Sequence, residues 1–281
     1  MMKPTDSYLT VPTWRFLDES LSARTRSALE SFAADDTLCQ LVGQQLSPPA
    51  VRTWVHDNTI VLGIQDHRLP HLEDALPVIH SAGYRTIVRN SGGLAVVLDQ
   101  GVLNISIVLS EQAGSIDIPA GYDVMLDFVR RLLPEAGDRI EAYEIVGSYC
   151  PGSYDLSIGG KKFAGISQRR LRQGVAVQVY LCVEGSGSDR AELVRQLYDK
   201  GLGGEETKFA YPDIRPETMA SLAELLGIPL TVTDVNLRVQ QLLHALAGEV
   251  QMGGFREDEM ELYTYYLQRV VDRNAKMIAR G

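Results

Sequence analysis

The chain has 281 residues, of which 27 are basic and 36 acidic, so its net charge is −9 at pH 7. This acidic balance argues against nucleic acid and anionic membranes as partners, because both repel a negatively charged protein. The three cysteines are too few for a disulfide framework, and no Cys/His cluster has the spacing of a metal site. We therefore expect a cytoplasmic protein without signal peptide or membrane span, and with neither metal nor cofactor.

The first part of the chain mixes helical and strand patterns behind a loose leader at residues 1–13. Apolar positions at helical spacing predict one or two amphipathic helices over 14–42. A helix over 69–82 is predicted to end at Gly83, since glycine commonly follows the last helical turn. Short apolar runs predict strands over 51–55, 59–64, 84–89, 94–98 and 103–109.

The rest of the chain contains one clear hairpin signal and several helices. Gly159-Gly160 separates two alternating runs, 154–158 and 161–166, and so predicts a tight β-hairpin. Because strands come in neighbouring pairs and do not alternate with helices, we expect an α/β (α+β) fold with a mixed, largely antiparallel sheet. The other predicted elements are a strand over 175–183 and flanking helices over 122–133, 189–204, 216–226, 235–247 and 257–279.

Cys150 is the first candidate for chemistry. Cysteines are most often buried apolar residues, and that interpretation suits Cys39 in a helical pattern and Cys182 in a strand. Cys150 differs, because Pro151-Gly152 imposes a turn directly after it and makes it a poor core residue. From the residues alone, a nucleophilic thiolate and a structural thiol explain Cys150 about equally well.

Lys162 lies in the second strand of the predicted hairpin. A cation beside a cysteine favours the reactive thiolate. The hairpin register places Lys162 opposite Ser157, however, and leaves Cys150 beyond the ladder. The loop at 147–153 must fold back over the sheet if the two side chains are to meet; otherwise Lys162 is a solvated lysine like Lys161.

A Gly-Gly turn follows the strand predicted over 84–89. In Arg89-Asn90-Ser91-Gly92-Gly93 the glycines allow a ligand close to the backbone, and their amide groups can bind a carbonyl or phosphate oxygen. A Gly-Gly turn is more often an ordinary hairpin, and this one lacks the Gly-Lys-Ser/Thr of a P-loop.

Together these segments resemble the superfamily of lipoate-protein ligases and octanoyltransferases, whose fold is shared with biotin-protein ligases (a class II synthetase-like fold). Residues 89–96 resemble its Arg-Arg-x-Ser-Gly-Gly-Gly-Ala-Val loop, and residues 162–165 its Lys-apolar-Ala/Ser-Gly element. Residues 54–65 resemble the strand and loop that open the family's domain. The resemblance implies a leader and helix at 1–34, a catalytic domain at 35–250 and a C-terminal helical tail at 251–281.

Within this superfamily the sequence favours a cysteine-dependent branch. This chain has Arg89-Asn90 in place of the arginine doublet, and Leu94 in place of the third glycine, which argues against ATP use. The stretch Tyr-Cys-Pro-Gly-Ser-Tyr-Asp-Leu-Ser at 149–157 is similar to octanoyltransferases of Gram-positive bacteria. The resemblance implies that Cys150 carries the octanoyl group as a thioester and that Lys162 activates it. It implies an acyl-binding site formed by Arg89, Ser91, Gly92, Gly93, Ala95, Ala164 and Gly165.

The resemblance also implies the partners. The donor would be the octanoylated H protein of glycine cleavage, and the acceptors would be lipoyl-domain lysines of 2-oxoacid dehydrogenases. Three alternatives remain open: an acyl carrier protein as donor, an ATP-dependent lipoate or biotin ligase, and a non-catalytic acyl-binding module.

Two surfaces follow from these implied substrates. The eight-carbon chain needs an apolar slot, for which we expect Ile87, Leu94, Val96 and Phe163. Acidic partners would need a local basic face, because the chain as a whole is acidic. The basic run Lys161, Lys162, Arg169, Arg170 and Arg172 is either that docking face or, equally, a solvated strand edge.

Overall fold

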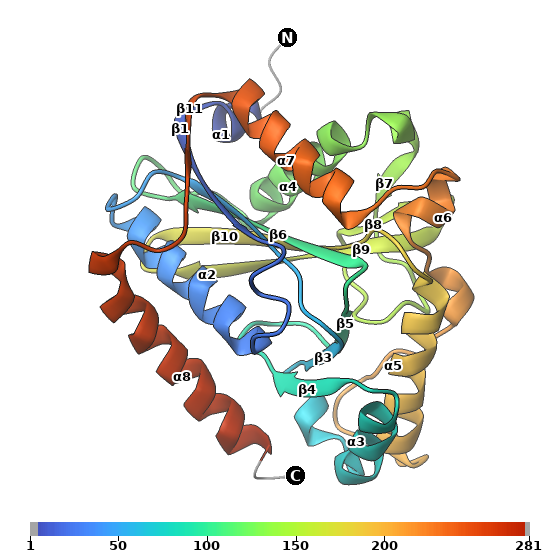
Figure 1. Cartoon of the computed structure of the whole chain (residues 1–281). Coiled ribbons are helices and arrows are strands. Elements are labelled where there is room, and N and C mark those ends of the chain that lie inside the picture. Colours follow the sequence, from blue (N-terminus) through green and yellow to red (C-terminus); the bar gives the residue numbers. More distant parts are fainter. Residues whose placement is uncertain (1–4, 279–281) are drawn as a thin grey trace.

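A computed structural model describes residues 5–278 and is built around an eight-stranded sheet (Figure 1). Its strands are β1 (Val11–Glu19), β2 (Ala50–Trp54), β6 (Val102–Ser110), β7 (Ile140–Ala142), β8 (Asp155–Ile158), β9 (Lys161–Leu171), β10 (Gly174–Cys182) and β11 (Ala247–Met252). They lie in the order β11-β1-β2-β6-β10-β9-β8-β7. Neighbours are antiparallel except at β1, which runs parallel to both β2 and β11. The predicted mixed, largely antiparallel sheet is confirmed.

A second, smaller sheet contains β3 (Thr59–Leu62), β4 (Arg85–Val88) and β5 (Val96–Leu98), in the order β4-β3-β5. In the sequence β2 and β3 are adjacent strands, as are β5 and β6, yet each of these pairs is divided between the two sheets. The turn His56-Asp57-Asn58 contains no glycine and is not a two-residue hairpin loop, so nothing local obliges β2 and β3 to pair. The chain instead passes from one sheet to the other at these points.

Helices cover both faces of the main sheet. They are α1 (Asp6–Leu9), α2 (Ala28–Gly43), α3 (Leu72–Ser81), α4 (Ile118–Leu132), α5 (Gly187–Leu202), α6 (Leu222–Leu226), α7 (Val232–Leu246) and α8 (Met260–Ile278), with 3-10 turns η1 (Asp66–Arg68), η2 (Pro134–Arg139), η3 (Pro216–Thr218) and η4 (Glu257–Glu259). In Figure 1, α4 and α7 lie on the opposite side of the sheet from α2 and α8. None of the helices described between residues 5 and 278 has the length and apolar character needed to span a membrane.

The central strand β10 shows why a strand of the core has a nearly continuous run of apolar residues. Val175 and Val177 pack into the core beneath α4 and α7, whereas Ala176 packs with Leu38 and Cys39 of α2. Because both faces of β10 are buried, successive residues are apolar and the usual alternation with polar residues is lost.

The prediction of helices over residues 14–42 is wrong in its first half. Residues 11–19 form β1, and helix α2 begins only after Ser27, whose hydroxyl and Glu30 form a capping box. Trp14 and Phe16 face one core and Leu17 faces another, so the run is buried on both sides and its apolar spacing imitates a helix. The three-part division of the chain stays a prediction; β1 and β11, which flank its middle part, pair with each other.

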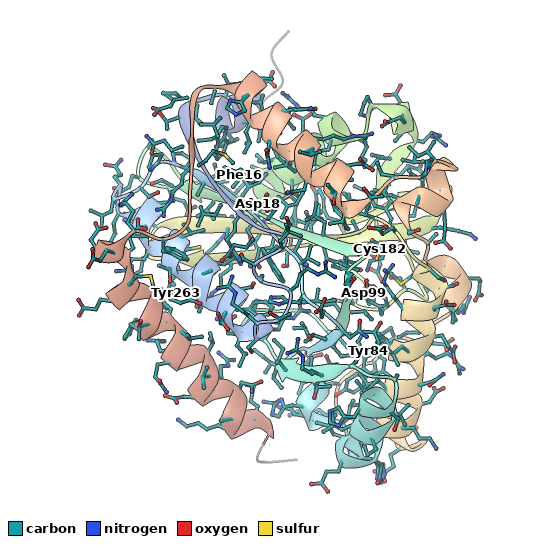
Figure 2. All side chains as sticks on the ribbon, in the orientation of Figure 1. Phe16, Asp18, Tyr84, Asp99, Cys182 and Tyr263 are labelled. Carbon is teal, nitrogen blue, oxygen red and sulfur yellow. The ribbon has the colours of Figure 1, made fainter. Side chains whose placement is uncertain are left out.

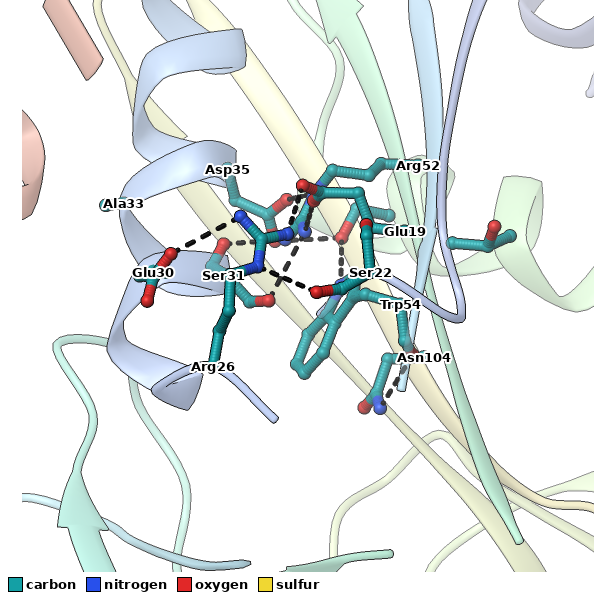
Figure 3. Close-up of polar contacts among 12 residues, drawn as sticks. Glu19, Ser22, Arg26, Glu30, Ser31, Ala33, Asp35, Arg52, Trp54 and Asn104 are labelled. Carbon is teal, nitrogen blue, oxygen red and sulfur yellow. Dashed lines mark hydrogen bonds and ion pairs between the residues drawn. The ribbon is translucent and has the colours of Figure 1, made fainter. Parts of the chain in front are cut away.

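A buried arginine ties α2 to the strands (Figure 3). Arg52 of β2 is inaccessible to solvent, and its guanidinium donates to Asp35 of α2 at 3.1 Å and to Glu19 of β1 at 2.7 Å. Asp35 in turn accepts hydrogen bonds from Ser106 of β6 and Gln178 of β10. Pairing of this kind offsets the desolvation of the charges and fixes how α2 lies on the sheet.

Candidate active site

Cys150 lies in the connection between β7 and β8, where its backbone has a φ of 46°. A left-handed backbone is uncommon outside glycine, and such strained residues cluster at functional sites. The thiol is partly exposed, whereas Cys39 and Cys182 are buried. Burial raises the pKa of both of those thiols. Cys150 is therefore the cysteine best placed to react with a substrate.

Two donors from the loop between β4 and β5 point at the Cys150 sulfur. The backbone N–H of Leu94 donates to Sγ with an N···S distance of 3.2 Å, and Arg89 Nη2 donates at 3.5 Å. Arg89 also donates to the Leu94 carbonyl at 2.5 Å, which closes the loop on itself. Hydrogen bonds to an ionised acceptor are stronger than those to a neutral one, so both donors stabilise a thiolate.

Gly93 makes this approach possible. Its φ is 100°, and a Cβ added to it would lie 2.2 Å from Arg89 Nη2 and 3.1 Å from Cys150 Sγ. Beneath it, a Cβ on Gly63 would lie 2.0 Å from the Gly93 carbonyl oxygen. Gly92 is different: a Cβ there would have no neighbour within 4 Å. The second glycine of the predicted turn is thus required by close packing, and the first is not.

Lys162 is fully buried beneath the Cys150 turn. Its Nζ lies 2.9 Å from Asp155 Oδ1, and it donates to the carbonyl oxygens of Tyr149 and Cys150 at 2.9 Å each and to Ser148 Oγ at 3.3 Å. The loop at 147–153 therefore does fold back over the sheet.

The ladder itself follows the predicted register, with Ser157 opposite Lys162. The path of the loop, and not the ladder, brings Lys162 to Cys150. Its three ammonium protons are shared among four oxygen atoms, and its contact with Cys150 is to the carbonyl oxygen. The predicted activation of Cys150 by Lys162 stays a prediction, and any contact of Lys162 with a bound acyl group would require one of these bonds to be exchanged.

Aromatic rings support the turn from below. Tyr149 stacks on Tyr180 with ring centroids 5.9 Å apart, and Lys162 Nζ lies 5.9 Å from each ring centroid. Gly165 leaves room for Tyr180, since a Cβ there would lie 2.7 Å from its ring. Ala164 is buried in a different core cluster from the two tyrosines and pairs with Leu181 of β10. Gly165 thus supports the turn indirectly, through the two stacked rings.

A buried carboxyl group holds the Leu94–Ala95 segment. Asp66 accepts hydrogen bonds from the Gly63 N–H at 2.6 Å and from the Tyr198 hydroxyl at 2.9 Å. The Tyr198 oxygen accepts a bond from the Ala95 N–H at 3.2 Å. Burial raises the pKa of Asp66 to about 6. Asp66, Tyr198 and Asp155 are not among the predicted site residues: no motif marks Asp66 or Tyr198, and the 149–157 stretch that contains Asp155 does not reveal its ion pair with Lys162.

The residues predicted to bind the acyl chain do not all gather at one place near Cys150. Ser91 is buried, and its hydroxyl has no hydrogen-bond partner within residues 5–278. Ile87 and Val96 pack in one core cluster and Phe163 in another, so these three do not line a common slot. A cavity of about 950 Å³ is lined by Asp18, Tyr84 and Asp99, labelled in Figure 2, among others, but not by Cys150 or Lys162.

Three of the five basic residues expected to form either a docking face or a solvated strand edge are engaged within the fold. Lys162 is buried, Arg169 is paired with Asp36 at 2.7 Å, and Arg170 is paired with Glu111 at 2.9 Å. These charges are neutralised within the fold, which the linear run of basic residues did not reveal. In the described part of the chain, no group of three or more His, Cys, Asp or Glu side chains is arranged to hold a metal ion.

Replacing Gly93 with alanine tests the donors at the sulfur. The new methyl group must displace Arg89, so we expect Gly93→Ala to slow alkylation of Cys150 by iodoacetamide at neutral pH about tenfold or more, the value of one charge-assisted hydrogen bond. Gly92→Ala is the matched control and should react like wild type. Equal alkylation rates in the two variants would remove these donors from any role in thiol reactivity.

Lys162→Ala should leave Asp155 buried without its cation. Removing one partner of a buried ion pair destabilises a protein by about 3–5 kcal/mol, and urea unfolding measures that change. The adjacent, exposed Lys161→Ala is expected to stay within about 0.5 kcal/mol of wild type. Equal unfolding free energies for Lys162→Ala and Lys161→Ala would contradict a stabilising role for the Lys162–Asp155 ion pair.

Asp66 also makes stability depend on pH. The free acid has an ordinary pKa of 3.8, and burial raises it to about 6. Folding therefore favours the neutral acid: its stabilising contribution is complete below pH 3.8 and is lost as pH rises through about 6, by about 3 kcal/mol. Asp66→Asn should lack this component, so the difference in unfolding free energy between wild type and variant should fall across this pH range. A difference independent of pH would show that burial does not raise the pKa of Asp66.

Comparison with known proteins identifies the family. A model of the lipoyl protein ligase A/B catalytic domain matches residues 27–244. A protein of Lysinibacillus sphaericus named octanoyl-[GcvH]:protein N-octanoyltransferase is 66% identical over 274 residues, covering 98% of this chain and 99% of the relative. A protein of the same name from Bacillus velezensis is 54% identical over 271 residues, covering 96% and 94%.

Solved structures agree on the fold. Lipoate-protein ligase A bound with ATP superposes with a TM-score of 0.66 at 16% identity, covering 92% of this chain and 94% of the other. A bi-partite lipoate-protein ligase from Thermoplasma acidophilum, described with its E2 lipoyl domain, gives 0.65 at 18% identity, covering 92% and 93%. The expected lipoate-protein ligase fold is thereby confirmed, and with the family match over most of its length, the chain belongs to the lipoyl protein ligase A/B catalytic domain family.

Proposed function

We propose that this chain is an octanoyl-[GcvH]:protein N-octanoyltransferase, which moves an octanoyl group from the H protein to lysines of lipoyl domains. The observation that carries the proposal is the partly exposed Cys150 thiol, held in a left-handed turn with Leu94 N–H and Arg89 directed at its sulfur. The name shared by relatives at 54–66% identity supports the choice of acyl group and donor. We place this reaction in the cytoplasm.

The reaction runs through a thioester. The Cys150 thiolate attacks the carbonyl carbon of the octanoyl amide, forming a C–S bond, and the C–N bond to the donor lysine breaks as its nitrogen takes up a proton. The acceptor lysine, as a free amine, then attacks the thioester, loses a proton, and expels the thiolate. One amide is broken and one is formed, so no nucleotide is consumed.

The surrounding residues have separate tasks in this proposal. Arg89 and the Leu94 N–H stabilise the attacking and departing thiolate. Lys162 holds the turn through the Cys150 carbonyl and activates the thiol through its charge. Ser91, Gly92, Gly93 and Ala95 border the acyl group, with Ser91 supplying a buried hydroxyl, and Ala164 and Gly165 shape the sheet beneath.

Intact-mass spectrometry tests the covalent step. Incubating the protein with octanoylated H protein and no nucleotide should add one octanoyl group to wild type and none to Cys150→Ser. Mapping the adduct by peptide analysis, with Cys39→Ser and Cys182→Ser as matched controls that keep the adduct, assigns it to Cys150.

The same assay separates the alternatives. Charging by octanoyl acyl carrier protein but not by H protein would replace the donor. Transfer that strictly needs ATP would make the chain a ligase. Binding of an octanoyl group without any transfer would make it an acyl-binding module, and an adduct that persists in Cys150→Ser would overturn the thioester.

A further inference from the structure

The C-terminal half of α8 borders a basic groove that contains no catalytic residue. The groove has a volume of about 620 Å³ and lies between α8 and η1. Its cations are Arg269, Arg273 and Lys276 of α8 and Arg68 of η1, facing the single carboxylate of Asp272. Positions 269, 273 and 276 recur at helical spacing, so they form one face of the helix.

These cations differ from several buried or partly buried arginines of the fold, which are paired with carboxylates. Arg15, Arg52, Arg131 and Arg190 each bind a carboxylate. Within residues 5–278, no ion pair is found for the four cations of the groove. Arg68 instead lies over the ring of Phe209, and Arg269 donates to the Tyr265 hydroxyl at 2.8 Å. The groove thus keeps unneutralised positive charge on a protein whose net charge is −9.

The groove adjoins the candidate active site on two sides. Asn274 of α8 accepts a hydrogen bond from the Val88 N–H at 2.8 Å, and the next residue along the chain is Arg89, which contacts the Cys150 sulfur. Ile64, at the edge of the groove, follows Gly63, which packs against the carbonyl of Gly93. Figure 1 shows the end of α8 beside β4. The groove is therefore linked to the Arg89 and Gly93 loop through one hydrogen bond and one neighbouring residue.

We propose that this basic groove docks an acidic face of the protein that carries the acylated lysine. Overall charge would repel an acidic partner, so such a partner must be attracted locally, and the groove is where the structure provides that attraction. Ile64 and Met277 add apolar surface beside the charges, as protein interfaces usually require. The inference rests on the proposed function, because it assigns the groove to the donor of that reaction.

Charge reversal at Arg273 tests the groove. Transfer from octanoylated H protein to wild type is compared with that to Arg273→Glu, Arg273→Lys and Arg139→Glu. Arg139 is an exposed arginine at the end of η2, directly before β7, and Figure 1 shows β7 across the molecule from α8. We expect Arg273→Glu to raise KM about tenfold with kcat retained and to weaken its dependence on salt, as for a charge at an interface rim. Arg273→Lys and Arg139→Glu should keep the wild-type KM.

Calorimetric binding of the unacylated H protein separates the two proposals. If the H protein binds wild type tightly and Arg273→Glu more weakly, the groove is supported as its docking site. Absence of octanoyl transfer alongside that result would overturn only the proposed function. Normal transfer with the same KM in Arg273→Glu and Arg139→Glu would overturn the groove and leave the function intact. A rise in KM of equal size in both variants would likewise overturn it, since the effect would then be one of net charge.

Discussion

The buried ammonium of Lys162 is the contact on which the site depends. Burying an unpaired charge costs several kcal/mol, so Lys162 needs the carboxylate of Asp155 and the carbonyl oxygens of Tyr149 and Cys150 around it. These partners are supplied only when the loop at 147–153 folds over the sheet. The same bonds hold the Cys150 backbone in its left-handed conformation, in which the residue stays partly exposed. The contacts that satisfy the buried charge of Lys162 are thus the same contacts that fix the position of Cys150.

The site forms where the two sheets meet. The main sheet contributes the Cys150 turn and Lys162 through the connection into β8 and through β9, and the small sheet contributes Arg89 and Leu94 through the loop between β4 and β5. Neither half contains the donors and the sulfur together. The closeness of Gly63, Gly93 and Arg89, together with the Asp66–Tyr198–Ala95 hydrogen bonds, sets the distance between the halves. The glycines at this junction are therefore required because they allow close packing, and not because they make the chain flexible.

What could be predicted was local. Gly159-Gly160 specifies its own hairpin, so the pairing of Ser157 with Lys162 followed from the sequence, as did Cys150 in a turn, whereas the register shift between Leu156 and Ser157 did not. Strand β1 was missed because its neighbours bury both faces, and β11 because its residues are largely exposed and carry little apolar pattern. The Leu94 N–H at the sulfur has no side-chain signature, and the pairing of Arg169 with Asp36 joins residues distant in sequence. Contacts set by the path of a loop cannot be read from spacing.

The pairing of β1 with β11 has a consequence for how the chain acquires its structure during synthesis. Val11 pairs with Ala247, so the sheet cannot be completed until residues 247–252 have left the ribosome. Until then β1 presents an unpaired edge, which other nascent chains or a chaperone can bind. Closing so long a loop also slows the final step of folding. Shortening the C-terminal region would thus impair the N-terminal strand first, far from the thiol.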